Sequence, residues 1–334
     1  MKAVIHRAYG SPEKVLSLEE VHKPSPKDGE VLVRVRAASM HPDVWHVIVG
    51  YPAVLRLMGN GVRRPKLRIP GTDLSGVVES VGKNVTRFKV GDEVFGESAT
   101  FGWRNGGAYA EFAAVPQDFL VLKPKNVTFE QAAAAPTAGM IALNNLGGAE
   151  RPKRQSVLIN GAGGCMGPIA VQIAKADGAR VTAVDRAEKL PMLQSLGADH
   201  VIDYKKEDYL QSGERYDLII DVVSIRSYEE YKHALSPSGS YIPIGHAHYD
   251  NSRRPILGDL PYFVSLLIRG LLDREKRKHF KIPTKPEALA IFRDLLESGK
   301  LSPVVARTFP LSEVHAAMRC MQEGETLGRV IITP

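Results

Sequence analysis

The stretch LINGAGGCMG (158–167) decides the fold class, because it joins an apolar, β-branched run to a helical pattern. Its four glycines stand where the predicted strand turns into the predicted helix: Gly161, Gly163, Gly164 and Gly167. Without side chains there, backbone N–H groups and the helix N-terminus can approach a pyrophosphate closely. The usual G-x-G-x-x-G pattern has Ala162 in its first position here. We interpret the stretch as a dinucleotide-binding turn, the alternative being a glycine-rich turn in another kind of α/β protein.

The segments around this turn alternate between strand and helix patterns. Short apolar runs predict strands at 156–160, 180–185, 200–204, 216–223 and 240–245. Helical spacing of apolar residues predicts helices at 166–179 and 187–198. Such alternation is typical of a parallel, doubly wound sheet. The sequence therefore predicts an α/β Rossmann domain in the centre of the chain.

The first 125 residues have a different pattern. Val31 to Ala37 alternates in the manner of a strand, and GDEVFG (91–96) places a turn pair before another strand. Frequent Gly and Pro turns between short strands predict a small barrel or sandwich. The pattern changes near residue 126, where Thr128 is a plausible N-cap for an Ala-rich helical stretch.

Composition limits the classes of function. At 334 residues a single core is not expected, so two domains are. The net charge of +7 is mild, and the basic run at 274–281 lacks the interleaved aromatics of a nucleic-acid surface. The two cysteines exclude a disulfide framework and a four-cysteine zinc site. The most apolar C-terminal run, 260–272, is shorter than the ~20 residues of a membrane span. Few thiols and an N-terminus without the apolar stretch of an export signal favour the cytosol. We therefore expect a cytoplasmic protein that binds neither nucleic acid nor membranes.

Charged residues at the end of the predicted strand 180–185 bear on the choice of dinucleotide. Asp185 ends the strand at 180–185, where a carboxylate can accept hydrogen bonds from both hydroxyls of an adenosine ribose. This favours NADH, because the charge would repel a 2′-phosphate. Arg186 and Lys189 follow directly, and these cations could hold that phosphate, so NADPH stays open. The alternative for both cations is a solvated helix start.

Motifs along almost the whole chain resemble the medium-chain dehydrogenase/reductase superfamily, particularly its zinc-independent, quinone-oxidoreductase-like branch. They stand in the family's order: MHPDVW (40–45), PGTDLSGVVESVG (70–82), VGDEVFG (90–96), GGAYAEF (106–112), NGAGGCMGPIAVQIAK (160–175), SLGADHVIDY (195–204) and GRVIITP (328–334). The resemblance implies a β-rich, chaperonin-10-like catalytic domain over 1–126 and 275–334. It also implies a Rossmann domain over 127–274 and a homodimer joined through the Rossmann sheets.

The same resemblance supplies further cofactor-binding candidates. Thr137 matches a position beside the nicotinamide, Tyr204 one near the adenosine, and Gly245 one where the chain passes close to the nicotinamide. Cys165 and Met166 belong to the glycine-rich turn itself, with Cys165 expected to be a packing residue. Arg329 is expected either to reach the cofactor phosphate or to be a solvated cation.

Zinc-dependent relatives carry a Cys-rich segment, a Gly-His-Glu segment and a lobe with four cysteines. Here the corresponding stretches read SMHPD and GTD, and the lobe region has no cysteine. His41, Asp43 and His46 form the only tempting cluster, but they do not match the family's ligand positions. We expect no metal. The alternatives are a zinc-dependent alcohol dehydrogenase and a non-catalytic, NAD(P)-binding sensor or structural protein.

Without a metal, hydride transfer favours acceptors that are already electrophilic, such as quinones, enones and related carbonyl compounds. The protein must then offer hydrogen-bond donors to the acceptor's oxygen. Candidate catalytic donors are His41, His46 and Tyr51. Relatives carry Asn-Pro where this chain has His41-Pro42, so this donor is expected to be able to titrate near neutral pH. The alternative is that His41 holds the local backbone through its ring nitrogens.

Overall fold

The computed structural model describes residues 1–57, 61–66, 68–99, 106–148, 150, 156–245, 261, 264, 265, 268 and 281–334. The chain divides into two compact units. The first comprises Met1–Ala138 and Thr284–Pro334, and the second comprises Gly139–Pro283. Among the described helices, none is both long and apolar enough to cross a membrane.

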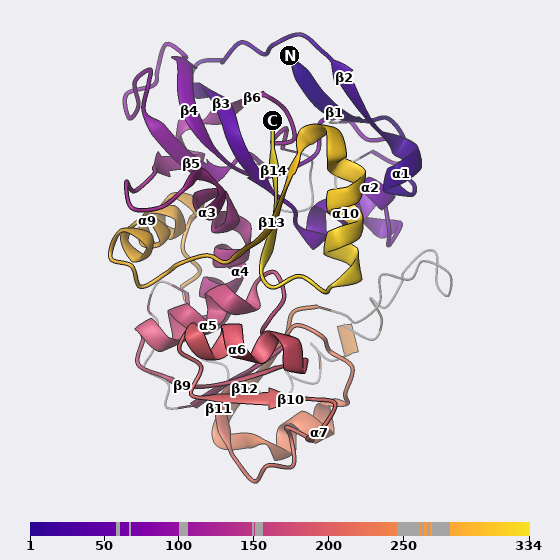
Figure 1. The fold of residues 1–334 in the computed structure, drawn as a ribbon, viewed down its shortest axis with the longest axis vertical. Coiled ribbons are helices and arrows are strands. Elements are labelled where there is room, and N and C mark those ends of the chain that lie inside the picture. Colours follow the sequence, from indigo (N-terminus) through magenta and orange to yellow (C-terminus); the bar gives the residue numbers. More distant parts are fainter. Residues whose placement is uncertain are drawn as a thin grey trace. The chain divides into compact units, whose positions relative to one another are not determined.

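The second unit is built on a five-stranded parallel sheet, which confirms the predicted Rossmann class (Figure 1). Its strands are β8 (Ser156–Asn160), β9 (Arg180–Asp185), β10 (His200–Asp203), β11 (Tyr216–Asp221) and β12 (Leu235–Pro243). The order β10-β9-β8-β11-β12 makes β8 the strand from which the sheet is wound in both directions. Ligands of such sheets bind at the carboxyl ends of the strands beside this switch point.

Helices cover both faces of this sheet. On one side lie α5 (Gly167–Ala176) and α6 (Leu190–Ser195), and on the other lies α7 (Tyr228–His233) (Figure 1). A short 3₁₀ turn, η3 (Ala187–Lys189), precedes α6, and Pro191 stands in the first turn of α6, as the sequence indicated. A capping box on Ser227 and Glu230 begins α7.

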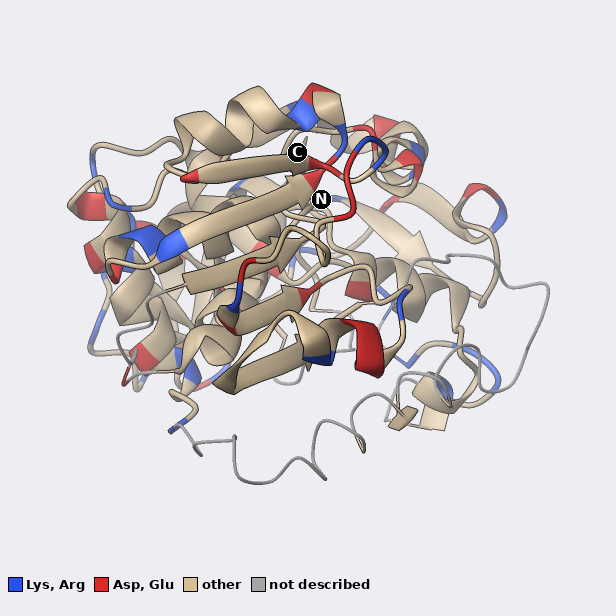
Figure 2. Cartoon of the chain, turned by 90° about the horizontal axis from the view of Figure 1, so that it is seen from below, with Lys and Arg blue, Asp and Glu red and all other residues tan. Residues whose placement is uncertain are grey.

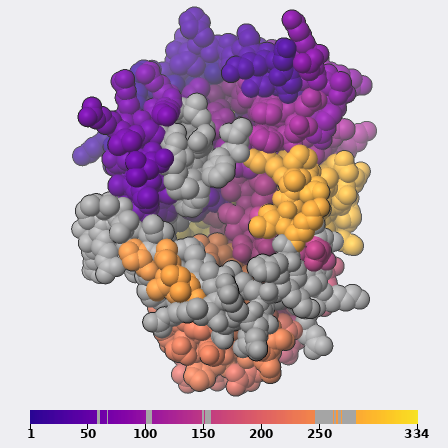
Figure 3. Space-filling view, turned by 180° about the vertical axis from the view of Figure 1, so that it is seen from behind, coloured from indigo at the N-terminus to yellow at the C-terminus, as the bar shows by residue number. Residues whose placement is uncertain are grey.

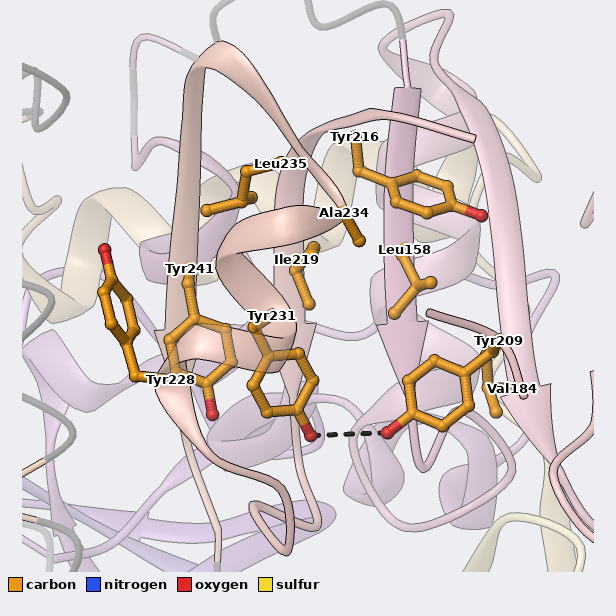
Figure 4. Packing of buried hydrophobic residues seen from close by; sticks show 10 residues of the cluster. All are labelled: Leu158, Val184, Tyr209, Tyr216, Ile219, Tyr228, Tyr231, Ala234, Leu235 and Tyr241. Atoms are coloured by element: carbon orange, nitrogen blue, oxygen red, sulfur yellow. Dashed lines mark hydrogen bonds between the residues drawn. The ribbon is translucent and has the colours of Figure 1, made fainter. Parts of the chain in front are cut away.

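Buried tyrosines fill much of the core on the α7 side of the sheet. Tyr231 and Tyr241 stack with ring centroids 4.4 Å apart, and the Tyr209 and Tyr231 hydroxyls lie 3.3 Å apart (Figure 4). The Tyr241 hydroxyl donates to Asp221 Oδ2 at 2.9 Å. Because the hydroxyls of Tyr209, Tyr231 and Tyr241 each have a polar partner, these three rings contribute burial without the cost of an unpaired polar group.

The first unit contains a seven-stranded, largely antiparallel sheet, in agreement with the predicted β-rich domain. Its strands are β3 (Glu30–Ser39), β4 (Asp73–Val81), β5 (Glu93–Glu97), β6 (Phe112–Pro116), β7 (Leu120–Leu122), β13 (Val305–Pro310) and β14 (Arg329–Thr333). The last strand, β14, pairs antiparallel with β3, so the end of the chain completes a sheet that its beginning starts. A separate antiparallel pair is formed by β1 (Lys2–His6) and β2 (Leu16–Glu20).

The helices and 3₁₀ turns of the first unit connect and cover these strands. They are α1 (Pro12–Val15), α2 (Pro42–Val49), α3 (Phe129–Ala134), α9 (Lys285–Glu297), α10 (Val314–Glu323), η2 (Gln117–Phe119) and η5 (Leu311–Glu313). In the space-filling view, the yellow residues after 284 lie against magenta residues of the same unit (Figure 3). Lys and Arg alternate with Asp and Glu over the described elements, without a large field of one sign (Figure 2).

The division between the units falls later than the expected boundaries of 126/127 and 274/275. It lies at 138/139 and 283/284. Thr128 does cap α3, through a capping box with Gln131, but the single helix expected after it is two, because Pro136 begins α4 (Pro136–Leu146). Ala133 and Ala134 of α3 pack in a buried cluster with Ile331 of β14, which keeps α3 in the first unit.

Candidate active site

The glycine-rich turn leaves β8 and enters α5 with a backbone that its glycines make possible. Gly161 has φ +79°, a left-handed conformation that side chains disfavour. A Cβ on Gly167 would lie 2.2 Å from the Ala162 carbonyl O, so only glycine allows this close packing. At Gly164 the nearest atom to an added Cβ is the Gly161 carbonyl O at 3.4 Å, and the turn is open there. This open backbone face at the start of a helix suits an anionic group.

Asp185 is bound to the turn rather than simply facing outward from the strand end. Its Oδ2 accepts from the Gly163 N–H at 2.7 Å, and its Oδ1 accepts from the Arg186 N–H at 2.9 Å. Each carboxylate oxygen retains a further lone pair. The carboxylate therefore fixes the turn and can still accept hydrogen bonds from a ligand's hydroxyls.

Lys189 lies over the same turn and is buried, unlike the solvated helix start that was the alternative for it. Its Nζ donates to the Gly163 carbonyl O at 3.2 Å and is 3.9 Å from Asp185 Oδ1. Burial lowers the pKa of Lys189, and the Asp185 charge opposes that shift. Arg186 is only half-buried. The structure thus brings together the glycines, Asp185 and Lys189.

Two further cofactor-binding candidates, Gly245 and Tyr204, lie beside this turn in the second unit. A third, Thr137, does not belong to that unit. A Cβ on Gly245 would lie 2.1 Å from the Val222 carbonyl O, and a Cβ on Gly161 would meet the Val222 side chain at 3.2 Å. Gly245 is thus beside the switch point. The Tyr204 N–H donates to the Asp185 carbonyl O at 3.3 Å, and its side chain is 44% exposed. Thr137 belongs to the first unit.

Cys165 and Met166 occupy the end of the turn. Met166 is buried and stands immediately before α5, whereas Cys165 is partly exposed and is a free thiol. The Met166 side chain accepts no capping hydrogen bond from the helix start. Their backbone, rather than their side chains, is what the turn offers to a ligand.

In the first unit, His41 begins helix α2 as its N-cap. The His41 Nδ1 accepts from the Asp43 N–H at 3.1 Å, so the ring proton is assigned to Nε2. The Pro42 ring at the first helical position and Gly50 with φ 66° at the end give this helix well-defined limits. His41 therefore does hold the local backbone, as the alternative for it stated.

The expectation that His41 titrates near neutral pH is not supported by its surroundings. The residue is only 4% exposed, and burial, followed by the nearby charges of Arg329 and His46, holds its pKa well below the usual 6.5. His41 is a neutral imidazole at neutral pH. It remains a hydrogen-bond donor through Nε2–H but is not an imidazolium acid.

His46 and Tyr51 lie at the other end of α2. The His46 Nδ1–H donates to the Tyr51 carbonyl O at 2.8 Å, and its ring packs edge-on against Trp45 with centroids 4.9 Å apart. Both His46 and Tyr51 are buried. The Nδ1 proton of His46 is thereby committed to the helix end, which gives this histidine a clear role in local structure.

The buried carboxylate of Asp73, on β4, makes hydrogen bonds to residues of β3, β14 and α4. Its Oδ2 accepts from the Ser39 hydroxyl at 3.0 Å and from Arg329 Nη2 at 3.1 Å. Its Oδ1 accepts from the Thr137 N–H at 3.2 Å and from the Thr137 hydroxyl. Burial raises the pKa of Asp73, and Arg329 and these hydrogen bonds oppose that shift. The sequence did not single out Asp73 as a centre of this kind.

Arg329 is 1% exposed and so is not a solvated cation. Besides its contact with Asp73, its Nη2 donates to the Ser39 hydroxyl. Within the described part of the chain, its Nε and Nη1 atoms are buried and have no hydrogen-bond partner. Buried donors of this kind fit an anionic ligand group.

Two more carboxyl groups complete this charged region. Burial raises the pKa of Glu97 to about 7, although Lys285 lies 2.9 Å from Glu97 Oε2. Burial, reinforced by the charges of Glu97 and Asp73, raises the pKa of Asp43 to about 7. Across the described residues, no group of three or more His, Cys, Asp or Glu side chains is arranged to hold a metal ion.

The chain matches two family models. One is described as the alcohol dehydrogenase GroES-like domain, over residues 27–125, and the other as a zinc-binding dehydrogenase, over residues 196–332. The chain is 31% identical to a chloroplast envelope quinone oxidoreductase homolog of Arabidopsis thaliana, covering 100% of this chain and 98% of that protein. It is also 31% identical to an NADPH-dependent alkenal/one oxidoreductase of the same plant, covering 100% and 80%.

A solved structure gives the same result. The quinone oxidoreductase from Coxiella burnetii superposes with a TM-score of 0.80 at 28% identity, covering 100% of this chain and 99% of that one. The similarity therefore extends over both units of the chain, and over the fold as well as the sequence.

Proposed function

The chain belongs to the quinone-oxidoreductase-like branch of the medium-chain dehydrogenase/reductase superfamily and is an NAD(P)H-dependent oxidoreductase, and we propose that it reduces quinones, enones or related carbonyl compounds without zinc. The observation that carries the proposal is the glycine-rich turn, open at Gly164 and braced by Asp185 and Lys189. Similar proteins are named for quinone and alkenal/one reduction, which supports this substrate class.

The residues at hand fit a nicotinamide dinucleotide. The turn's backbone N–H groups and the start of α5 would hold the pyrophosphate, while Asp185 would accept from the adenosine ribose. Gly245 and Tyr204 border the same strand ends, and Thr137 is a further candidate. When bound, the nicotinamide supplies a hydride, the one reagent that these side chains do not provide.

We propose NADH as the preferred donor. The Asp185 carboxylate brings a buried negative charge to the position where a 2′-phosphate would lie. Lys189 is already engaged with the Gly163 carbonyl and with Asp185, so its charge is largely balanced before a ligand binds. Arg186 is the remaining cation that favours NADPH.

We propose that the reaction needs no zinc, because of the contacts that the possible zinc ligands of the first unit make. Catalytic zinc takes about three nitrogen, sulfur or oxygen ligands from the protein. His41 Nδ1 and His46 Nδ1 each make a hydrogen bond to the backbone, with the Asp43 N–H and the Tyr51 carbonyl O, and Asp73 is paired with Arg329. These potential ligand side chains of the first unit thus already make other contacts. Metal analysis of the purified active protein should find no stoichiometric zinc, whereas one zinc per chain would support an alcohol dehydrogenase.

His41 is the proposed hydrogen-bond donor to the acceptor's oxygen, through its Nε2–H. His46 and Tyr51 are retained as neighbouring candidates, with His46 limited to its second ring nitrogen. Stabilising the negative charge that develops on the oxygen is the main contribution that such a donor makes.

The test is the oxidation of NADH and of NADPH, titrated separately, over a panel of quinones and enones. Steady turnover above a protein-free control supports the proposal, and cofactor deuterated at C4 should transfer its label to an enone carbon. Tight cofactor binding without turnover of any acceptor would identify a sensor or structural protein instead.

Cellular location and assembly are part of the same proposal. We propose a cytoplasmic homodimer that acts on a small molecule and binds neither nucleic acid nor membranes. Fractionation of the source cells and sedimentation of the purified protein test these two points.

A further inference from the structure

Ser224, three residues after the end of β11, has a left-handed backbone conformation. Its φ is 52°, and among the described residues other than glycine it alone has a positive φ. A side chain disfavours this conformation, because its Cβ then lies close to the following carbonyl oxygen. Ser224 is buried, and its Oγ donates to the Asp221 carbonyl O at 3.3 Å. Such a conformation persists only where the surrounding structure imposes it, and it is most often found at functional sites.

The Asp221 carboxylate holds this conformation through hydrogen bonds to the backbone. Asp221 is the last residue of β11 and is fully buried. Its Oδ1 accepts from the Val223 N–H at 3.1 Å and from the Ser224 N–H at 2.9 Å, so one oxygen holds two successive amides. The same oxygen accepts from Asn160 Nδ2 at 2.8 Å, at the end of the neighbouring strand β8. The other oxygen, Oδ2, accepts from the Tyr241 hydroxyl at 2.9 Å.

The segment held in this way, residues 222–224, lies between two glycines of the proposed cofactor site. A Cβ on Gly161 would lie 2.9 Å from Val223 Cγ2, and a Cβ on Gly245 would lie 2.1 Å from the Val222 carbonyl O. This 222–224 turn thus follows the strand next to β8, at the switch point where ligands of such sheets bind. In another conformation, its two valines would no longer lie against these glycines as they do here.

We propose that Asp221 is a positioning residue for the cofactor, an inference that rests on the proposed function: it keeps the 222–224 turn in the conformation that binds the dinucleotide. Asp221 acts through the turn and not by contact with the cofactor, because its carboxylate is buried and accepts hydrogen bonds from the protein. Without the carboxylate, the left-handed conformation at Ser224 becomes a minor state. Binding then has to select that state, and the apparent dissociation constant rises by the inverse of its population.

The experiment measures NADH dissociation constants by isothermal titration, with unfolding curves of the same proteins. Asp221→Ala should raise the constant ~5–30-fold, the ratio that corresponds to the left-handed penalty of one residue. Adding Ser224→Gly to Asp221→Ala should restore part of the affinity, because glycine adopts a positive φ without that penalty. Asp221→Asn should keep most of the affinity, since its amide oxygen can accept from the turn while its NH₂ donates to the Tyr241 hydroxyl. The matched control is Tyr241→Phe, which removes a hydrogen bond to the same carboxylate but none to the turn, and it should bind NADH as the wild type does.

The rescue by glycine separates positioning from a general role in stability, which Ser224→Gly would not restore. If Asp221→Ala does not fold, Ser224→Thr replaces it: this variant keeps the carboxylate and adds one methyl group, and it should weaken NADH binding several-fold because β-branched residues strongly disfavour a positive φ. Wild-type affinity in Asp221→Ala or in Ser224→Thr, or an Asp221→Ala protein that Ser224→Gly does not rescue, overturns the inference alone. A wild-type protein that binds neither NADH nor NADPH overturns the proposed function as well.

Discussion

Arg329 Nη2 lies 3.1 Å from Asp73 Oδ2, and both side chains are almost completely buried. The two residues are 256 positions apart, so this ion pair ties the last strand of the chain to β4. Breaking a buried pair on one side leaves an uncompensated charge, whereas removing both charges can be nearly neutral.

We expect Arg329→Met and Asp73→Leu each to lower the free energy of unfolding by ~3–5 kcal/mol. The double variant should lose clearly less than the sum of the two. Urea unfolding followed by tryptophan fluorescence measures this, because Trp45 is a buried residue of the first unit. Strictly additive losses would show that the pair is not coupled in the folded protein.

Cofactor preference should depend on Asp185. In Asp185→Asn, the amide NH₂ group would face either the Gly163 N–H or the Arg186 N–H, so one of these two hydrogen bonds is lost. The change also removes the negative charge that opposes a 2′-phosphate. We expect the NADH dissociation constant to rise ~10–100-fold, the value of one charge-assisted hydrogen bond, while NADPH loses less. Isothermal titration with each cofactor measures both constants.

The control for this prediction is Glu188→Gln, which removes an exposed charge from η3 in the same region. It should leave the ratio of the two dissociation constants unchanged. If Asp185→Asn also leaves that ratio unchanged, Asp185 does not discriminate between the two cofactors.

These residues show what the sequence could and could not predict. The glycine turn was predictable because its geometry is local: a strand, a close approach and a helix start within ten residues. The burial of Lys189 was missed, although its i,i+4 spacing from Asp185 was a usable signal. The low pKa of His41 was not predictable, since its burial comes from elements far along the chain.

The charged region of the first unit could not be predicted from the sequence either, because its members are far apart along the chain. Lys285 pairs with Glu97 although 188 residues separate them, and no spacing rule links such positions. The start of α2 did carry a signal, since a Pro at the first helical position and a Gly after the last residue mark helix limits. Features set by neighbouring residues, such as helix limits, could therefore be predicted from the sequence. Contacts between distant strands could be found only in the structure.

Stability should depend on pH through His6. This histidine of β1 is fully buried, and its Nε2–H donates to the Ile48 carbonyl O at 2.9 Å. Burial lowers the pKa of His6 from its ordinary 6.5 to about 4. Between these values the unfolded chain binds the proton more readily than the folded protein does, so stability falls as pH decreases from about 6.5 to 4.

The size of this effect is ~3 kcal/mol, from a shift of about 2.5 pH units at 1.36 kcal/mol each. His6→Gln keeps a donor for Ile48 but does not titrate. Its free energy of unfolding should therefore decrease less between pH 7 and 4.5 than that of the wild type. Parallel urea titrations at several pH values give the difference, and identical decreases in the two proteins would contradict the prediction.

The last prediction concerns Glu97, which raises the pKa of Asp43 through its charge. Glu97→Gln removes that charge, so the Asp43 carboxylate becomes easier to form and its pKa should fall. The midpoint of the Asp43 carboxyl titration, followed by ¹³C NMR, should then lie at lower pH than in the wild type. An unchanged midpoint in Glu97→Gln would mean that the charge of Glu97 does not act on Asp43.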